Sequence, residues 1–198
     1  MNDAVKQTLL ARVYDVAIES PLDKAAKLSK QLGCDVYLKR EDLQPVHSFK
    51  LRGAYNKIAQ LTDEERKKGV LAASAGNHAQ GVALAAQKLG ISALIVMPRT
   101  TPDIKVEAVK SYGAEVELFG DNYSEAAEYA KRRVEETGRT YIHPFDDPLV
   151  IAGQGTIGRE ILEQLPSVTH IFVPVGGGGL IAGIAQFIKA LRPEVKII

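Results

Sequence analysis

Short apolar runs alternate along this 198-residue chain with longer segments in which apolar residues recur at helical spacing. We expect strands at residues 36–39, 70–74, 93–97, 115–119, 171–175 and 195–198. We expect helices over residues 48–61, 79–89, 102–112, 123–134, 157–165 and 180–191. Continuous apolar strands separated by amphipathic helices are typical of parallel strands covered by helices on both faces. The pattern therefore predicts an α/β protein built on open parallel sheets.

The C-terminal part of the chain needs a closer look. Residues 171–188 carry no charge and so reach the ~18 residues of a membrane-spanning helix. Pro174 and four consecutive glycines interrupt this stretch, which therefore cannot form one continuous helix. We expect a strand, a glycine loop and a helix in a soluble protein. The last run, 195–198, opens a strand with no helix after it, which indicates the front part of a longer protein.

Composition and charge exclude several classes of protein. The 25 basic and 24 acidic residues give a net charge of +1, whereas a nucleic-acid binder needs a basic surface. Cys34 is the single cysteine, so it can form neither an internal disulfide nor a cysteine metal cluster, and we expect a reducing cytoplasm. The N-terminus lacks the basic head and apolar stretch of a secretory signal.

In open α/β sheets ligands bind where strands lead into helices, and three junctions of this chain carry residues suited to that task. At the first, Ser48 is placed to cap a helix, which puts Lys50 in the first turn. The helix dipole disfavours a cation there, so we expect Lys50 to lose its proton readily, as a Schiff-base nucleophile must. A solvated surface lysine is the ordinary alternative.

The second junction is a run of small and polar residues: Ser74, Ala75, Gly76, Asn77 and His78. Small residues let a ligand approach the main chain, and a helix start offers amide donors to a carboxylate. An ordinary turn, with Asn77 as a cap and His78 exposed or hydrogen-bonded, is equally consistent with the sequence.

The third junction is the tetraglycine run, which consists of Gly176, Gly177, Gly178 and Gly179. Four glycines are costly in conformational entropy, and they make sense if several N–H groups converge on a phosphate. Residues 153–158 also match G-x-G-x-x-G, but the acidic ribose contact expected ~20 residues later is absent. We interpret residues 153–158 as close helix packing and rank a nicotinamide dinucleotide behind a monophosphate cofactor.

A Schiff-base lysine, a carboxylate-sized loop and a phosphate cradle together suggest pyridoxal 5′-phosphate. The sequence resembles the fold-type II (tryptophan synthase β-like) pyridoxal-phosphate enzymes and, among them, the threonine ammonia-lyases or threonine dehydratases, nearer the biosynthetic branch. The matching stretches, within residues 39–183, are KREDLQPVHSFKLRGAYNK, SAGNHAQGVA, IVMP, FDDPLVIAGQGTIG and FVPVGGGGLIAG.

The resemblance implies a role for each site residue. Lys50 would bond to the cofactor aldehyde and later act as base at the substrate Cα. Phe49 would flank the cofactor ring and Asn77 would hydrogen-bond its 3′-oxygen. The phosphate would be held by Gly176, Gly177, Gly178, Gly179 and Leu180, and the amino-acid carboxylate by the loop of Ser74, Ala75, Gly76, Asn77 and His78. The reaction implied is β-elimination of L-threonine, and of L-serine, to 2-oxobutanoate or pyruvate and ammonia, as in isoleucine biosynthesis.

The resemblance also implies how the chain is organised. Residues 1–47 would begin a large lobe, 48–143 would form a small lobe, and 144–198 would continue the large lobe without completing it. The full-length form would be a homo-oligomer, and we expect this portion alone to bind the cofactor weakly and to turn over little.

Two positions favour the lyase within the superfamily. Leu51 follows the lysine where threonine and cysteine synthases commonly carry Asp, and Ala75 stands where serine racemases place a serine as the second base. Two other classes stay open at this point: a nicotinamide-dependent oxidoreductase, based on residues 153–158, and a non-catalytic interaction module.

Overall fold

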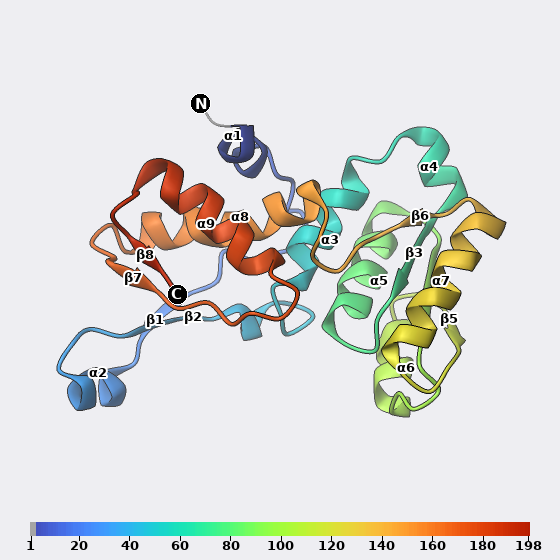
Figure 1. Cartoon of the computed structure of the whole chain (residues 1–198), viewed down its shortest axis with the longest axis horizontal. Helices are drawn as coiled ribbons and strands as arrows, with labels where there is room; N and C mark the ends of the chain where they lie inside the picture. Colours follow the sequence, from blue (N-terminus) through green and yellow to red (C-terminus); the bar gives the residue numbers. More distant parts are fainter. Residues whose placement is uncertain (1–2) are drawn as a thin grey trace.

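The computed structural model describes residues 3–198, and α3 joins two groups of elements (Figure 1). The helices are α1 (Asp3–Leu9), α2 (Ala26–Leu32), α3 (Lys50–Ala59), α4 (Asp63–Lys68), α5 (Asn77–Leu89), α6 (Asp103–Lys110), α7 (Tyr123–Thr137), α8 (Pro148–Gln164) and α9 (Gly179–Leu191), with a short 3-10 helix, η1 (Glu41–Leu43). The strands are β1 (Leu22–Lys24), β2 (Tyr37–Lys39), β3 (Val70–Ala73), β4 (Ala93–Met97), β5 (Glu115–Leu118), β6 (Thr140–Tyr141), β7 (His170–Ile171) and β8 (Lys196–Ile197).

The first group is built on a four-stranded parallel sheet with the order β5-β4-β3-β6. Side chains of Val70 and Ile95 pack against α3, α5 and α6 on one face, while Leu71 and Leu94 pack against α7 on the other. Alternate residues of a strand point to opposite faces, so strands covered on both sides must be apolar throughout. The central strands β3 and β4 meet that requirement, and β5 lies at the edge as its alternating pattern predicts.

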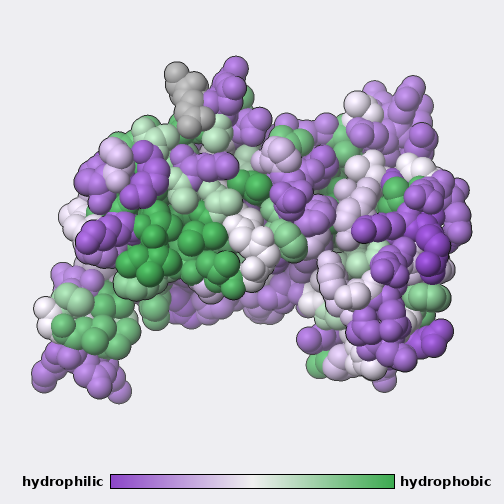
Figure 2. All heavy atoms as spheres, viewed as in Figure 1, coloured by the Kyte–Doolittle hydropathy of each residue, from purple (hydrophilic) through white to green (hydrophobic). Residues whose placement is uncertain are grey.

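The second group contains α1, α8, α9 and the parallel pair β7–β8. The strand predicted at 171–175 is shorter than expected and ends at Ile171, and the side chains of Phe172 and Val175 are 75% and 62% exposed. Apolar surface gathers over this group in Figure 2, and a patch of that kind is typical of a face that packs against further polypeptide. Within residues 3–198, no helix is long and apolar enough to cross a membrane.

One prediction about the N-terminal part is wrong. The strand expected at residues 36–39 begins at Tyr37 and pairs antiparallel with β1, so it belongs to no parallel sheet. The apolar pattern did not predict β1, because two of its three residues, Asp23 and Lys24, are charged and exposed. This hairpin carries α2 away from the rest of the molecule (Figure 1).

Glycines on α8 let three helices approach one another closely. A Cβ atom on Gly153 would lie 2.7 Å from the main chain of α3, at the carbonyl oxygen of Arg52. A Cβ atom on Gly155 would lie 3.1 Å from the carbonyl oxygen of Gly183 on α9, and one on Gly158 would lie 3.3 Å from that of Ile184. Residues 153–158 therefore lie inside a helix and pack against helices, which confirms the packing interpretation and removes the strand-to-helix turn that a dinucleotide site requires.

Replacing Gly153 by Ala should lower the free energy of unfolding by about 1–3 kcal/mol, because the added methyl group must push α3 away from α8. Urea unfolding monitored by circular dichroism measures this loss. Gly176→Ala is the matched control, since a Cβ atom there would meet nothing within 4 Å. Equal losses in the two variants would contradict the argument.

Candidate functional site

Lys50 is the first residue of α3 and follows Phe49, which is the N-cap in place of the predicted Ser48. The Ser48 hydroxyl instead accepts a long hydrogen bond, 3.4 Å, from the Lys50 main-chain N–H. The Lys50 Nζ atom donates a hydrogen bond of 2.7 Å to the carbonyl oxygen of Pro144. Burial lowers the pKa of Lys50 below its ordinary value. The direction of the predicted shift is correct, but its cause is desolvation and not the helix dipole.

The tetraglycine run and Lys50 line the same cleft. This cleft has a volume of about 300 Å³ and is lined by Phe49, Lys50, Phe145, Pro174, Val175, Gly176, Gly177, Gly178, Gly179 and Leu180. Sites for small ligands commonly enclose roughly 300–1,000 Å³. The structure thus brings together Lys50, Phe49 and residues 176–180, the residues that the sequence analysis places around one phosphorylated ring.

Different features of the structure require glycine at positions 177, 178 and 179, and none requires it at position 176. Gly177 and Gly179 pack against Phe145, because a Cβ atom on Gly177 would overlap its ring and one on Gly179 would lie 2.6 Å from its carbonyl oxygen. Gly178 has a φ of +90°, which favours glycine. Gly176 has no positive φ, and a Cβ atom there would have open space around it. The fold therefore explains three of the glycines and leaves Gly176 open for close approach of a ligand.

The loop at residues 74–78 leads into α5 but does not line this cleft. Asn77 is exposed, and Ser74, Ala75 and Gly76 are half-buried. The His78 ring is buried, with its Nε2 atom 2.8 Å from the carbonyl oxygen of Ile142. Its Nδ1 atom has no hydrogen-bond partner among the described residues. The cofactor contact of Asn77 and the carboxylate contacts of this loop stay predictions.

The segment between β6 and α8 contributes to the site, and the sequence analysis did not single it out. Pro144 accepts the hydrogen bond from Lys50, and Phe145 lines the cleft and packs against Gly177 and Gly179. The His143 ring nitrogen Nδ1 accepts hydrogen bonds from the main-chain N–H groups of Phe145 and Asp146, at 3.3 and 2.7 Å. The residue types of this segment give no sign of a contact with Lys50, which is 94 positions away from Pro144.

Comparison with known proteins decides the family. A family model described as "Pyridoxal-phosphate dependent enzyme" matches residues 13–198. The chain belongs to this family. Among curated members it is 64% identical over 191 residues to the biosynthetic, chloroplastic threonine dehydratase 1 of Solanum lycopersicum, covering 96% of this chain and 32% of the relative. The chain therefore spans about a third of the length of that relative.

Two solved structures of family members superpose on nearly the whole chain. The processed form of threonine deaminase isoform 2 from Solanum lycopersicum is 57% identical with a TM-score of 0.96, and covers 98% of this chain and 54% of its own. Maize serine racemase is 40% identical with a TM-score of 0.94, and covers 98% and 59%. The family and the fold therefore agree with those expected from the resemblance.

The buried His78 should make stability depend on pH. Burial, with smaller contributions from nearby Lys50 and His143, lowers the pKa of His78 to about 4 from 6.5. The unfolded chain therefore takes up the proton first, and the free energy of unfolding should fall as the pH decreases from 6.5 to about 4. His78→Gln should remove up to roughly 3 kcal/mol of that decline, as measured by urea unfolding across this range. The exposed His170→Gln is the control, and an identical decline in both variants would contradict the assignment.

Proposed function

We propose that the whole protein to which this chain belongs is a pyridoxal-phosphate-dependent ammonia-lyase that acts on L-threonine, and on L-serine. The observation that carries the proposal is the single cleft shared by the Lys50 amine and the tetraglycine run. A primary amine with a lowered pKa suits an aldehyde, and unpaired main-chain N–H groups suit a phosphate. The name of the 64% identical tomato relative, a biosynthetic threonine dehydratase, supports the same activity and a place in isoleucine biosynthesis.

The residues of the cleft fit the cofactor. Lys50 Nζ would hold its aldehyde carbon, the N–H groups of Gly176, Gly177, Gly178, Gly179 and Leu180 would hold its phosphate, and Phe49 would lie beside its ring. When bound, pyridoxal phosphate supplies the electron sink that acidifies the substrate Cα–H. The open space at Gly176 allows an anion to approach the main chain, which a side chain would prevent.

Lys50 would also move the proton of the reaction, once the amino group of the substrate has displaced its Nζ atom from the aldehyde carbon. Burial leaves more of its amine neutral at a given pH than in an exposed lysine, so the amine can take the proton from the substrate Cα. Loss of the Cα proton and of the β-hydroxyl together releases one water molecule, and hydrolysis of the remaining enamine gives 2-oxobutanoate and ammonia from threonine, or pyruvate and ammonia from serine. The carbonyl of Pro144 would orient Nζ before the cofactor binds.

We place the substrate carboxylate at the start of α5. This helix of 13 residues begins after Gly76, and the N–H groups in the first turn of a helix have no partner within the helix. Ala75 in this loop has no exchangeable proton, which favours elimination from one face of Cα over the racemisation named for the maize neighbour. We also propose that the whole protein is a homo-oligomer. A cytoplasmic location is a further proposal, and it is supported by Cys34, an exposed free cysteine that suits a reducing compartment.

Adding pyridoxal phosphate to the whole protein should produce a visible absorbance band that Lys50→Ala abolishes. The same variant should lower ammonia release from threonine by roughly 10²- to 10⁴-fold, because the general base is lost. Lys88→Ala is the control, since Lys88 is exposed in the last turn of α5, and it should leave band and rate unchanged.

Each other outcome points to a different class. A Lys50-dependent band without 2-oxoacid from threonine or serine would indicate a cofactor-binding module. Formation of D-serine from L-serine would indicate a racemase. Fluorescence energy transfer from the protein to bound NADH, with no visible absorbance band after pyridoxal phosphate is added, would refute the proposal and favour the oxidoreductase.

A further inference from the structure

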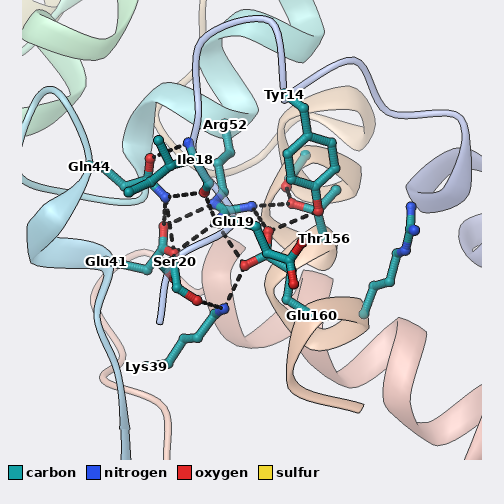
Figure 3. A network of polar contacts seen from close by, with 12 residues as sticks. Tyr14, Ile18, Glu19, Ser20, Lys39, Glu41, Gln44, Arg52, Thr156 and Glu160 are labelled. Atoms are coloured by element: carbon teal, nitrogen blue, oxygen red, sulfur yellow. Dashed lines mark hydrogen bonds and ion pairs between the residues drawn. The ribbon is translucent and has the colours of Figure 1, made fainter. Parts of the chain in front are cut away.

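A buried polar network is centred on Arg52, which lies two residues after Lys50 in the first turn of α3. The Arg52 guanidinium, which is 0% exposed, donates to both oxygens of Glu41, through Nε at 2.9 Å and Nη2 at 2.8 Å. It also donates to both oxygens of Glu160 on α8 (Figure 3). Further bonds of 3.1 Å reach the hydroxyl of Thr156 and the carbonyl oxygen of Ile18.

The charges of the network balance, because it contains two carboxylates, Glu41 and Glu160, and two cations, Arg52 and Lys39. Lys39 Nζ lies 2.6 Å from Glu160 Oε2 and donates to the Ser20 carbonyl oxygen and to Gln164, while the Tyr14 hydroxyl donates to Glu160 Oε1 at 2.8 Å (Figure 3). The two carboxylates thus face two cations. Burial disfavours the charged form of Glu160, but Arg52 and Lys39 outweigh it and hold its pKa below the usual range. A guanidinium with its donors used in this way has little freedom to move.

This arrangement ties the first turn of α3 to α8. Arg52 is two residues after Lys50, and the remainder of α3 is bound to the start of α8 by two further contacts. Asn56 Nδ2 donates to the carbonyl oxygen of Leu149 at 2.7 Å, and Lys57 pairs with Asp147 at 2.9 Å. The Pro144 carbonyl that holds the Lys50 amine comes three residues before Asp147, the N-cap of α8.

The same helix also places the tetraglycine run. Gly155 and Gly158 of α8 allow main-chain contact with Gly183 and Ile184 of α9, and α9 begins at Gly179. The amine and the glycine loop therefore belong to two helices, α3 and α9, that both pack against α8. A tilt of α3 on α8 would move the amine relative to the loop while both helices stayed folded.

We propose that Arg52, held by Glu160 and Glu41, is a positioning residue that sets where the Lys50 amine stands relative to the tetraglycine run. Arg52 touches neither the cleft nor a ligand in it. What the amine then does depends on the proposed function, but its placement by Arg52 does not.

The test is Arg52→Lys in the whole protein, because a lysine keeps the charge but cannot reach both carboxylates with a rigid fork. In the cofactor-free protein, labelling of Lys50 by an amine-selective reagent is followed by peptide mass spectrometry from pH 7 to 11. We expect the midpoint of labelling to move to higher pH, as the loosened amine gains water. We also expect the affinity for pyridoxal phosphate to fall by roughly tenfold to a hundredfold.

Arg133→Lys is the matched control. Arg133 on α7 also grips two carboxylates, with Glu117 at 2.9 Å and Glu136 at 2.7 Å, but it lies on the outer face of the four-stranded sheet. It should change neither the labelling of Lys50 nor the affinity. If Arg52→Lys lowers the unfolding midpoint while both Lys50 readouts stay unchanged, the network is purely structural and the proposal is wrong.

Milder variants decide the matter if Arg52→Lys does not fold. Thr156→Val removes one acceptor of Arg52, and Tyr14→Phe removes one donor to Glu160. A shift of the Lys50 labelling midpoint in the same direction supports the proposal, and no shift in either variant overturns it. Labelling of Lys50 needs no cofactor. If the protein fails to bind pyridoxal phosphate, the proposed function is wrong, but the labelling midpoints still test the role of Arg52.

Discussion

The burial of the Arg52 guanidinium is the constraint on which the rest of the structure depends. A charge this far from water is tolerated only when its hydrogen bonds are made and its charge is balanced, which Glu41 and Glu160 accomplish together. Such a network adds little net stability compared with apolar packing, but losing one partner costs about 3–5 kcal/mol. Its physical effect is therefore geometric, since η1, α3 and α8 can meet in this one arrangement without leaving a buried charge unpaired.

Close helix contact follows from the same arrangement. Gly53 and Gly153 let α3 and α8 touch through their main chains, and this brings Arg52 within reach of Glu160, more than a hundred positions later in the chain. Gly155 then brings α9 onto the other side of α8. The cleft is thus assembled from three segments that are far apart in sequence and share one helix as their support. Helices packed to main-chain contact have few alternative positions, so the residues that line the cleft are held in fixed positions relative to one another.

Patterns local in sequence predicted much of this structure. The parallel sheet follows from the apolar runs of β3 and β4. The expectation that Lys50 and the tetraglycine run serve one ligand comes from their residue types and from the family resemblance, and the two do line one cleft. The antiparallel hairpin was missed because charged β1 has no apolar signal. The roles of Pro144 and Phe145 were not predicted for a different reason. The contact of the Pro144 carbonyl with Lys50 and the packing of the Phe145 ring on glycine depend on the tertiary structure, and residue type alone does not indicate them. The cause of the Lys50 shift was missed likewise, because burial is set by distant segments.

The electrostatics of the cleft follow from what surrounds it. Among the described residues that line it, Lys50 is the one with an ionisable side chain, and Asp146 lines the adjoining hollow that shares Phe145 and residues 177–179 with the cleft. Two carboxylates that contact α3, Glu41 and Glu160, are paired with Arg52, and Glu160 is also paired with Lys39. An amine beside a buried carboxylate would keep its proton, whereas one facing a carbonyl oxygen and apolar walls gives it up more readily. Lys50 faces the carbonyl oxygen of Pro144, and its burial lowers its pKa in the direction that suits a nucleophilic amine.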